Sequence, residues 1–117
     1  MTELVALLSM GKGTWSEVAR LIKSQEWEKV FLLTNEFGSR FRGGENVELL
    51  VVDFTKDIGA LRDEMRAKLD GKIKGLEVAV NLASGEGKEH MALLSVLMRL
   101  GVGFRIVTVT EKGCEEV

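Results

Sequence analysis

The sequence predicts an α/β domain in which helices cover both faces of a mostly parallel, five-stranded sheet, giving three layers. Short unbroken apolar segments, such as residues 4–8, alternate along the chain with segments whose apolar residues recur at helical spacing. Strands that are apolar at every position are typical of parallel sheets buried between two helical layers. Thirteen glycines stand mostly between these segments, and proline is absent. Glycines in these positions indicate tight turns between short elements rather than linkers between domains.

Length and charge exclude several classes of protein. The chain has 117 residues, a formal net charge of −2 and a pI of about 5.5, which suits one domain over residues 1–117. A slightly acidic chain is unsuited to coating duplex nucleic acid, which needs many lysine and arginine contacts to phosphate. The apolar runs are far shorter than the roughly 20 residues that cross a bilayer, and the first residues do not resemble a secretory signal. With one cysteine and one histidine, neither a disulfide nor a zinc site is expected, and we expect a cytoplasmic protein.

The elements follow one another in a regular order. The strands are predicted at residues 4–8, 30–33, 47–52, 76–82 and 104–109, and the helices at residues 15–23, 57–69 and 89–100. Thr14 is the expected N-cap of the first helix, in a capping box with Glu17. Residues 35–45 carry no helical pattern, so either they form a parallel crossover without a helix or the third strand pairs unusually. From Glu111 onward we expect a short polar tail.

The third predicted helix is apolar around much of its circumference. One stripe consists of Leu93, Val96, Leu97 and Leu100, and a second of Met91, Leu94 and Met98. A helix with two apolar stripes is covered on two sides. In a chain of this size, we expect the second cover to be another copy of the protein, so that Met91, Leu94 and Met98 form a homodimer interface. The alternative is a loop or the C-terminal tail lying across the helix.

Two glycine-rich turns are the candidate binding loops. Each follows a predicted strand and opens onto a helix, and each combines glycine and hydroxyl residues with a lysine. Free N–H groups and the positive end of the helix dipole make such a position an anion site, and phosphate is the usual anion. The alternative is that the glycines only permit the turns and the lysines are solvated. The expected ligand-binding residues are Gly11, Lys12, Gly13, Thr14, Asn81, Ser84, Gly85, Gly87 and Lys88.

Two nucleotide-binding motifs fit the sequence incompletely. The turn ending in Gly87-Lys88 looks like a P-loop, but Leu82 and Glu89 replace the required first glycine and the magnesium-binding hydroxyl residue. A Walker-type nucleotidase is therefore excluded. The first turn has the spacing G-x-G-x-x-G with Ser16 in the third position, and Glu36 follows the second strand where a ribose-binding acid would stand. A domain that binds NAD or NADP therefore stays as the alternative.

The second half of the chain resembles the CRISPR-associated Rossmann-fold (CARF) family. The resemblance lies in a strand ending Val80-Asn81-Leu82, a glycine-rich turn with Lys88, and a largely apolar helix after it. In that family, such a strand ends in Asn-Leu-Thr/Ser-Gly-Gly-Thr-Lys. The first two strands and the first turn also resemble the family, so the likeness covers most of residues 3–110. Here the turn is one residue longer, Ala83 and Glu86 stand where a hydroxyl residue and glycine are usual, and a loop replaces the usual helix between strands two and three.

The resemblance implies a Rossmann-like regulatory domain that senses a cyclic oligoadenylate, an antiviral defence signal, at a dimer interface. It makes Lys88 the phosphate-contacting residue. If the protein also cleaves the ring, it would be a metal-independent ring nuclease without a cofactor, because the ribose 2′-OH can attack its own phosphodiester. Lys88 would then stabilise the charge and Ser9 would position the reacting groups. A third class is an interaction subunit without catalysis, whose loops bind no ligand.

Overall fold

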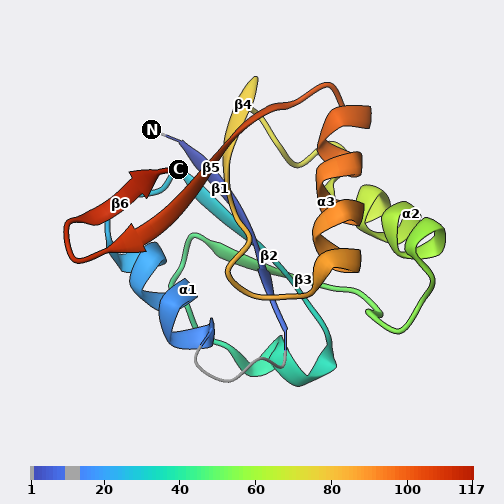
Figure 1. Ribbon diagram of the computed structural model, residues 1–117, viewed down its shortest axis with the longest axis horizontal. Coiled ribbons are helices and arrows are strands. Elements are labelled where there is room, and N and C mark those ends of the chain that lie inside the picture. Colours follow the sequence, from blue (N-terminus) through green and yellow to red (C-terminus); the bar gives the residue numbers. More distant parts are fainter. Residues whose placement is uncertain (1, 10–13) are drawn as a thin grey trace.

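The computed structural model describes residues 2–9 and 14–117, which form six strands, three α-helices and one 3₁₀ helix (Figure 1). The strands are β1 (Glu3–Leu8), β2 (Lys29–Thr34), β3 (Val47–Val51), β4 (Glu77–Asn81), β5 (Gly103–Thr110) and β6 (Gly113–Glu116). The helices are α1 (Thr14–Lys23), η1 (Glu36–Arg40), α2 (Ile58–Leu69) and α3 (Gly87–Arg99), η1 being the 3₁₀ helix. Strands and helices alternate through α3, as the apolar pattern predicts.

All six strands belong to one sheet, in the order β3-β2-β1-β4-β5-β6. β3, β2, β1, β4 and β5 are parallel, and β6 is antiparallel to β5. The prediction of five strands was therefore wrong by one. The expected polar tail is β6, the second strand of a hairpin that pairs Val109 with Cys114. Its residues are partly exposed, so backbone pairing forms this edge strand and no apolar run reveals it.

The sheet separates two hydrophobic clusters. In β1, Val5 and Leu7 face the cluster shared with α2 and α3, whereas Leu4, Ala6 and Leu8 face the cluster shared with α1. Figure 1 shows α1 on one side of the sheet and α2 with α3 on the other. The three-layer arrangement and the mostly parallel α/β sheet are thus as predicted. β1 is fully buried because it is central and covered on both faces.

The connection from β2 to β3 is a parallel crossover without an α-helix, the first of the two expected alternatives. It contains η1, whose N-cap Asn35 accepts a hydrogen bond from the Gly38 amide at 3.1 Å through its side chain. Gly38 lies so close to β2 that an added Cβ would be 1.8 Å from Thr34 Oγ1. Only glycine permits this approach, which folds the short connection back over the sheet.

The helix boundaries differ slightly from the prediction. α1 begins one residue earlier than expected, so that Thr14 is its first residue and not its N-cap, and α3 begins at Gly87, two residues earlier than expected, with Glu86 as its N-cap. α3 packs on the sheet and on α2, so its second cover comes from the same chain. Leu94 lies partly buried in this core, while Met91 and Met98 remain 60% and 65% exposed. Among the residues that the structure describes, no helix is long and apolar enough to cross a membrane.

Candidate functional site

The candidate site lies where the order of the strands reverses. β1 is followed by α1 and then by β2 on one side of it, whereas its other neighbour, β4, is followed by α3 and then by β5. The connections after β1 and β4 therefore run to opposite faces of the sheet (Figure 1). In open parallel sheets, ligands bind beyond the carboxyl ends of the strands at such a switch point. Both predicted binding turns start there.

Ser84 joins the two turns. Its hydroxyl oxygen accepts hydrogen bonds from the Ser9 amide at 2.8 Å and from Thr14 Oγ1 at 3.1 Å, and it lies 3.2 Å from Ser9 Oγ. These contacts connect residues about 70 positions apart and bring Ser9 and Thr14 next to the turn after β4. Ser84 itself is fully buried, so it joins the two turns from inside the fold.

Gly85 shapes the second turn because its φ of +99° is a conformation that side chains rarely adopt. An added Cβ would also lie 3.3 Å from His90 Nε2. His90 Nε2 lies 2.9 Å from the Ser84 carbonyl oxygen. Because a carbonyl can only accept, this hydrogen bond requires the tautomer protonated at Nε2. His90 therefore supports the backbone of the turn.

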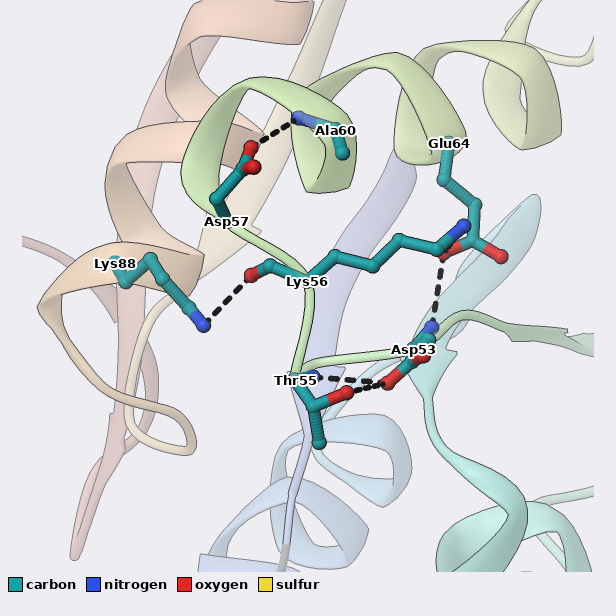
Figure 2. A network of polar contacts seen from close by, with 7 residues as sticks. All are labelled: Asp53, Thr55, Lys56, Asp57, Ala60, Glu64 and Lys88. Atoms are coloured by element: carbon teal, nitrogen blue, oxygen red, sulfur yellow. Dashed lines mark hydrogen bonds and ion pairs between the residues drawn. The ribbon is translucent and has the colours of Figure 1, made fainter.

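Lys88 reaches across the crevice to the loop that follows β3. Its ammonium group donates hydrogen bonds to the carbonyl oxygens of Phe54 and Lys56, both at 2.8 Å. Figure 2 shows the side chain extending from the start of α3 to Lys56. Among the described residues, Lys88 forms no ion pair with Glu86. An ammonium group has three donors, so one donor remains for a ligand.

The cavity at this switch point has a volume of about 530 Å³. Its lining residues are Ser9, Thr14, Asn35, Phe54, Thr55, Ala83, Gly85, Glu86, Lys88 and Glu89. They come from the carboxyl ends of four strands and the start of α3. The cavity is large enough for part of a nucleotide. Lys88 is its only cation among the described lining residues, opposite the carboxylates of Glu86 and Glu89.

The predicted binding residues fall into three groups. Ser9, Thr14, Gly85 and Lys88 line the cavity, and Gly87 is exposed at the start of α3. Asn81, however, is buried, and its amide donates to the Val107 carbonyl oxygen at 3.0 Å while its side-chain oxygen accepts from the Ala83 amide. Asn81 thus ties β4 to β5 and to the turn. Neither Asn81 nor Ser84, which is also buried, lines the cavity. Gly11, Lys12 and Gly13 lie outside the described residues.

Asn35, Phe54 and Thr55 also line the cavity but were not among the predicted ligand-binding residues. Asn35 and Thr55 are polar residues beyond the ends of β2 and β3, at the edge of the sheet where ligands are expected. Phe54 contributes its carbonyl oxygen, a backbone atom that no residue pattern reveals.

A second cavity of about 380 Å³ adjoins the first. The two cavities share Asn35, Phe54 and Thr55, and the second is also lined by Glu36, Phe37, Val51, Val52, Asp53 and Glu64. Thr55 donates to Asp53 Oδ1 from its hydroxyl at 2.6 Å and from its amide at 2.9 Å (Figure 2). These two hydrogen bonds lower the pKa of the Asp53 carboxyl below its usual value, with smaller contributions from nearby Lys56 and Lys88. Asp53 is therefore a carboxylate at neutral pH.

The two cavities differ in charge. The first combines one lysine with hydroxyls, a helix N-terminus and the carboxylates of Glu86 and Glu89, whereas the second has three carboxylates, of which Glu64 pairs with Lys56 at 3.3 Å. The first cavity therefore opposes an anionic group less than the second does, and hydroxyl or amino groups are favoured in the second. Comparison of the sequence with models of protein families finds no match, and comparison with curated proteins finds none either. The geometry defines the class: an α/β domain with a polar crevice at its switch point.

Proposed function

We propose that the protein is a Rossmann-like domain that binds a phosphate-containing nucleotide in the switch-point cavity. The observation that carries this proposal is the convergence of Ser9, Thr14 and Lys88 on one cavity at the start of α3. The Lys88 ammonium group and the Ser9 hydroxyl are donors that suit phosphate oxygens, whereas the Thr14 hydroxyl already donates to Ser84. The N-terminus of α3 adds the positive end of its dipole, although the amides of Glu86 and Glu89 are already paired with carboxylates in a capping box.

The resemblance to CARF domains sharpens the proposal to a cyclic oligoadenylate, bound across the two-fold axis of a homodimer in the cytoplasm. Met91 and Met98 are the α3 side chains left for contact with a second copy, because Leu94 is already partly buried within the chain. Binding is better supported than ring cleavage. Lys88 already directs two donors to backbone carbonyls, so at most one can stabilise charge on a reacting phosphate.

A dinucleotide such as NAD is the second candidate, favoured by the position of Glu36. This residue follows the end of β2, is exposed, and lines the cavity that adjoins the first. A carboxylate there suits the hydroxyls of a ribose. We expect Glu36→Gln to weaken NAD binding if this candidate is right, and to leave binding of a cyclic oligoadenylate nearly unchanged.

Thermal denaturation with a ligand panel tests the proposed function. A ligand that binds only the folded chain raises its Tm, and the rise grows with the logarithm of the ratio of ligand concentration to Kd. The panel contains cyclic oligoadenylates, NAD, NADP and nucleoside triphosphates, with inorganic phosphate as a control for general anion binding. A rise in Tm with one nucleotide that phosphate does not reproduce supports the proposal. No rise with any member contradicts it and favours an interaction subunit without a ligand.

A further inference from the structure

The second cavity contains the aromatic ring of Phe37, which is exposed to solvent and is not part of either hydrophobic cluster. Phe37 lines this cavity and is 61% exposed. Of the exposed large hydrophobic side chains in the part of the chain that the structure describes, Phe37 is the only aromatic one. Burying a phenylalanine stabilises a fold by about 1.5–3 kcal/mol, so leaving this ring in solvent forgoes a large gain.

The Phe37 ring is nevertheless held in place. It meets the indole of Trp15 edge to face, with ring centroids 5.6 Å apart and the planes at 67°. Trp15 is itself fixed, because its Nε1 donates to the Ser9 carbonyl oxygen at the end of β1. Phe41 packs against the indole as well, with centroids 6.1 Å apart. Phe37 thus stands on an anchored aromatic pair and needs little ordering before it binds a flat ligand.

The surroundings of Phe37 select the kind of group it can bind. The same cavity is lined by Glu36, Asp53 and Glu64, and among the described residues no hydrogen bond or ion pair engages the Glu36 carboxylate. These charges repel phosphate. They attract hydrogen-bond donors such as ribose hydroxyls and the amino group of a base, and the aromatic ring offers a surface for stacking.

We infer that Phe37 is a base-stacking residue and that the second cavity holds the nucleoside end of the ligand. This inference rests on the proposed function, since it divides one nucleotide between two adjoining cavities. The phosphate lies in the first cavity, beside Lys88 and the α3 N-terminus, and the base lies on Phe37 in the second. The ligand passes between the cavities along their shared lining residues, Asn35, Phe54 and Thr55. The predicted ligand class is therefore a nucleotide with an accessible base, not a polyphosphate or a sugar phosphate.

Two probes that differ only in the base test this inference. Adenosine 5′-monophosphate and ribose 5-phosphate are titrated by calorimetry into the parent protein and into Phe37→Leu and Phe37→Tyr. Phe37→Leu keeps an apolar side chain but removes the ring, whereas Phe37→Tyr keeps the ring. Because base–aromatic stacking contributes about 1–3 kcal/mol, we expect Phe37→Leu to bind the adenosine probe roughly 5-fold to 150-fold more weakly. Phe37→Tyr should match the parent, and ribose 5-phosphate should bind all three proteins equally.

Failure of this inference differs from failure of the proposed function. If the parent binds the adenosine probe and Phe37→Leu binds it equally well, the stacking role is overturned while nucleotide binding stands. If the parent binds both probes with equal affinity, the base is not recognised and the inference is again overturned. If the parent binds neither probe nor any nucleotide of the panel, the proposed function fails too. Emission from Trp15, next to Phe37, gives an independent signal that should change with the adenosine probe and not with ribose 5-phosphate.

Discussion

The ammonium group of Lys88 lies 2.8 Å from the carbonyl oxygen of Lys56, across the crevice that separates α3 from the loop after β3 (Figure 2). A lysine predicted to contact phosphate is thus already part of the scaffold. It holds together two walls of the cavity, and its remaining donor can reach a ligand. Binding and loop order are therefore linked through this one side chain.

Lys88→Ala should weaken nucleotide binding by about 1–3 kcal/mol, the cost of losing one charge-assisted hydrogen bond. Because the loop at residues 54–56 loses its tether, its amides should also exchange faster with solvent. Calorimetry and hydrogen exchange measure the two effects. Lys68→Ala is the matched control, because Lys68 is exposed on α2 and forms no ion pair among the described residues. Equal affinities of Lys88→Ala and the parent would show that Lys88 serves the scaffold alone.

Glu86→Gly should tighten nucleotide binding, because the exposed carboxylate of Glu86 lines the cavity and repels phosphate. The substitution removes the Glu86 side chain from the capping box of α3, but glycine is itself accepted at an N-cap, so α3 should keep its start. The affinity of the variant for the best ligand of the panel is the measurement. Unchanged affinity in both this variant and Lys88→Ala would mean that the turn before α3 binds no phosphate.

Ser84→Ala should destabilise the fold by about 1–3 kcal/mol, since the partly buried Ser9 amide and the Thr14 hydroxyl lose their acceptor. Urea denaturation of the variant and the parent measures the loss. Ser95→Ala is the control, because its hydroxyl accepts only a 3.3 Å hydrogen bond from Arg99 on the surface of α3. A Ser84→Ala variant as stable as the parent would contradict the role of Ser84 in joining the two turns.

The chain is predicted to be a dimer at micromolar concentration, with Met91 and Met98 at the interface. These side chains lie two turns apart on α3 and are both exposed. Light scattering on the parent and on Met98→Lys measures the mass, and the substitution should produce a monomer. Leu76→Lys is the control, because Leu76 is 91% exposed and lies outside α3. A parent that is monomeric would remove the two-fold ligand site.

Thr55→Val should raise the pKa of Asp53 toward its ordinary value of 3.8, because the Thr55 hydroxyl is the largest cause of its lowering. A carboxyl whose pKa is lowered on folding stabilises the fold above its unfolded pKa, and this contribution disappears as the pH falls through the folded pKa. The parent should therefore gain stability over Thr55→Val above about pH 4 and lose that difference in stronger acid. NMR titration of the Asp53 carboxyl checks the shift. Identical titration curves would contradict it.

Gly38→Ala should destabilise the protein by about 1–3 kcal/mol or prevent folding, because the new methyl group collides with Thr34 in the buried end of β2. Thr34 cannot move freely, since its hydroxyl donates to the Leu8 carbonyl oxygen at 2.6 Å. Gly59→Ala in α2 is the contrasting variant, with only ordinary contacts around the added methyl. It should stabilise the helix by roughly 0.5–1 kcal/mol. The denaturation midpoints of both variants are compared with that of the parent. A Gly38→Ala variant as stable as the parent would contradict the prediction.

The sequence by itself determined the alternation of strands and helices, because continuous apolar runs and helical spacing are local patterns. It also placed the two glycine-rich turns after β1 and β4, and the parallel sheet then brought their ends together at one edge. For the segment after β2, the sequence left open whether it forms a parallel crossover without a helix or whether β3 pairs unusually, because the segment lacks a helical pattern. The structure shows the crossover, with a 3₁₀ helix of five residues within it.

Only the tertiary structure decided what the polar side chains do. From the sequence, both Asn81 and Ser84 were predicted to bind the ligand. In the structure, Asn81 ties β4 to β5, and Ser84 joins two turns about 70 residues apart. Lys88 donates to two backbone carbonyl oxygens, and β6 pairs with β5 through backbone groups. Every residue type has these backbone groups, so the sequence does not identify them as partners. Burial of the strands and helices follows the apolar pattern of the chain and can therefore be predicted from the sequence. Hydrogen bonds depend on directions and distances between groups that only the packed fold brings together.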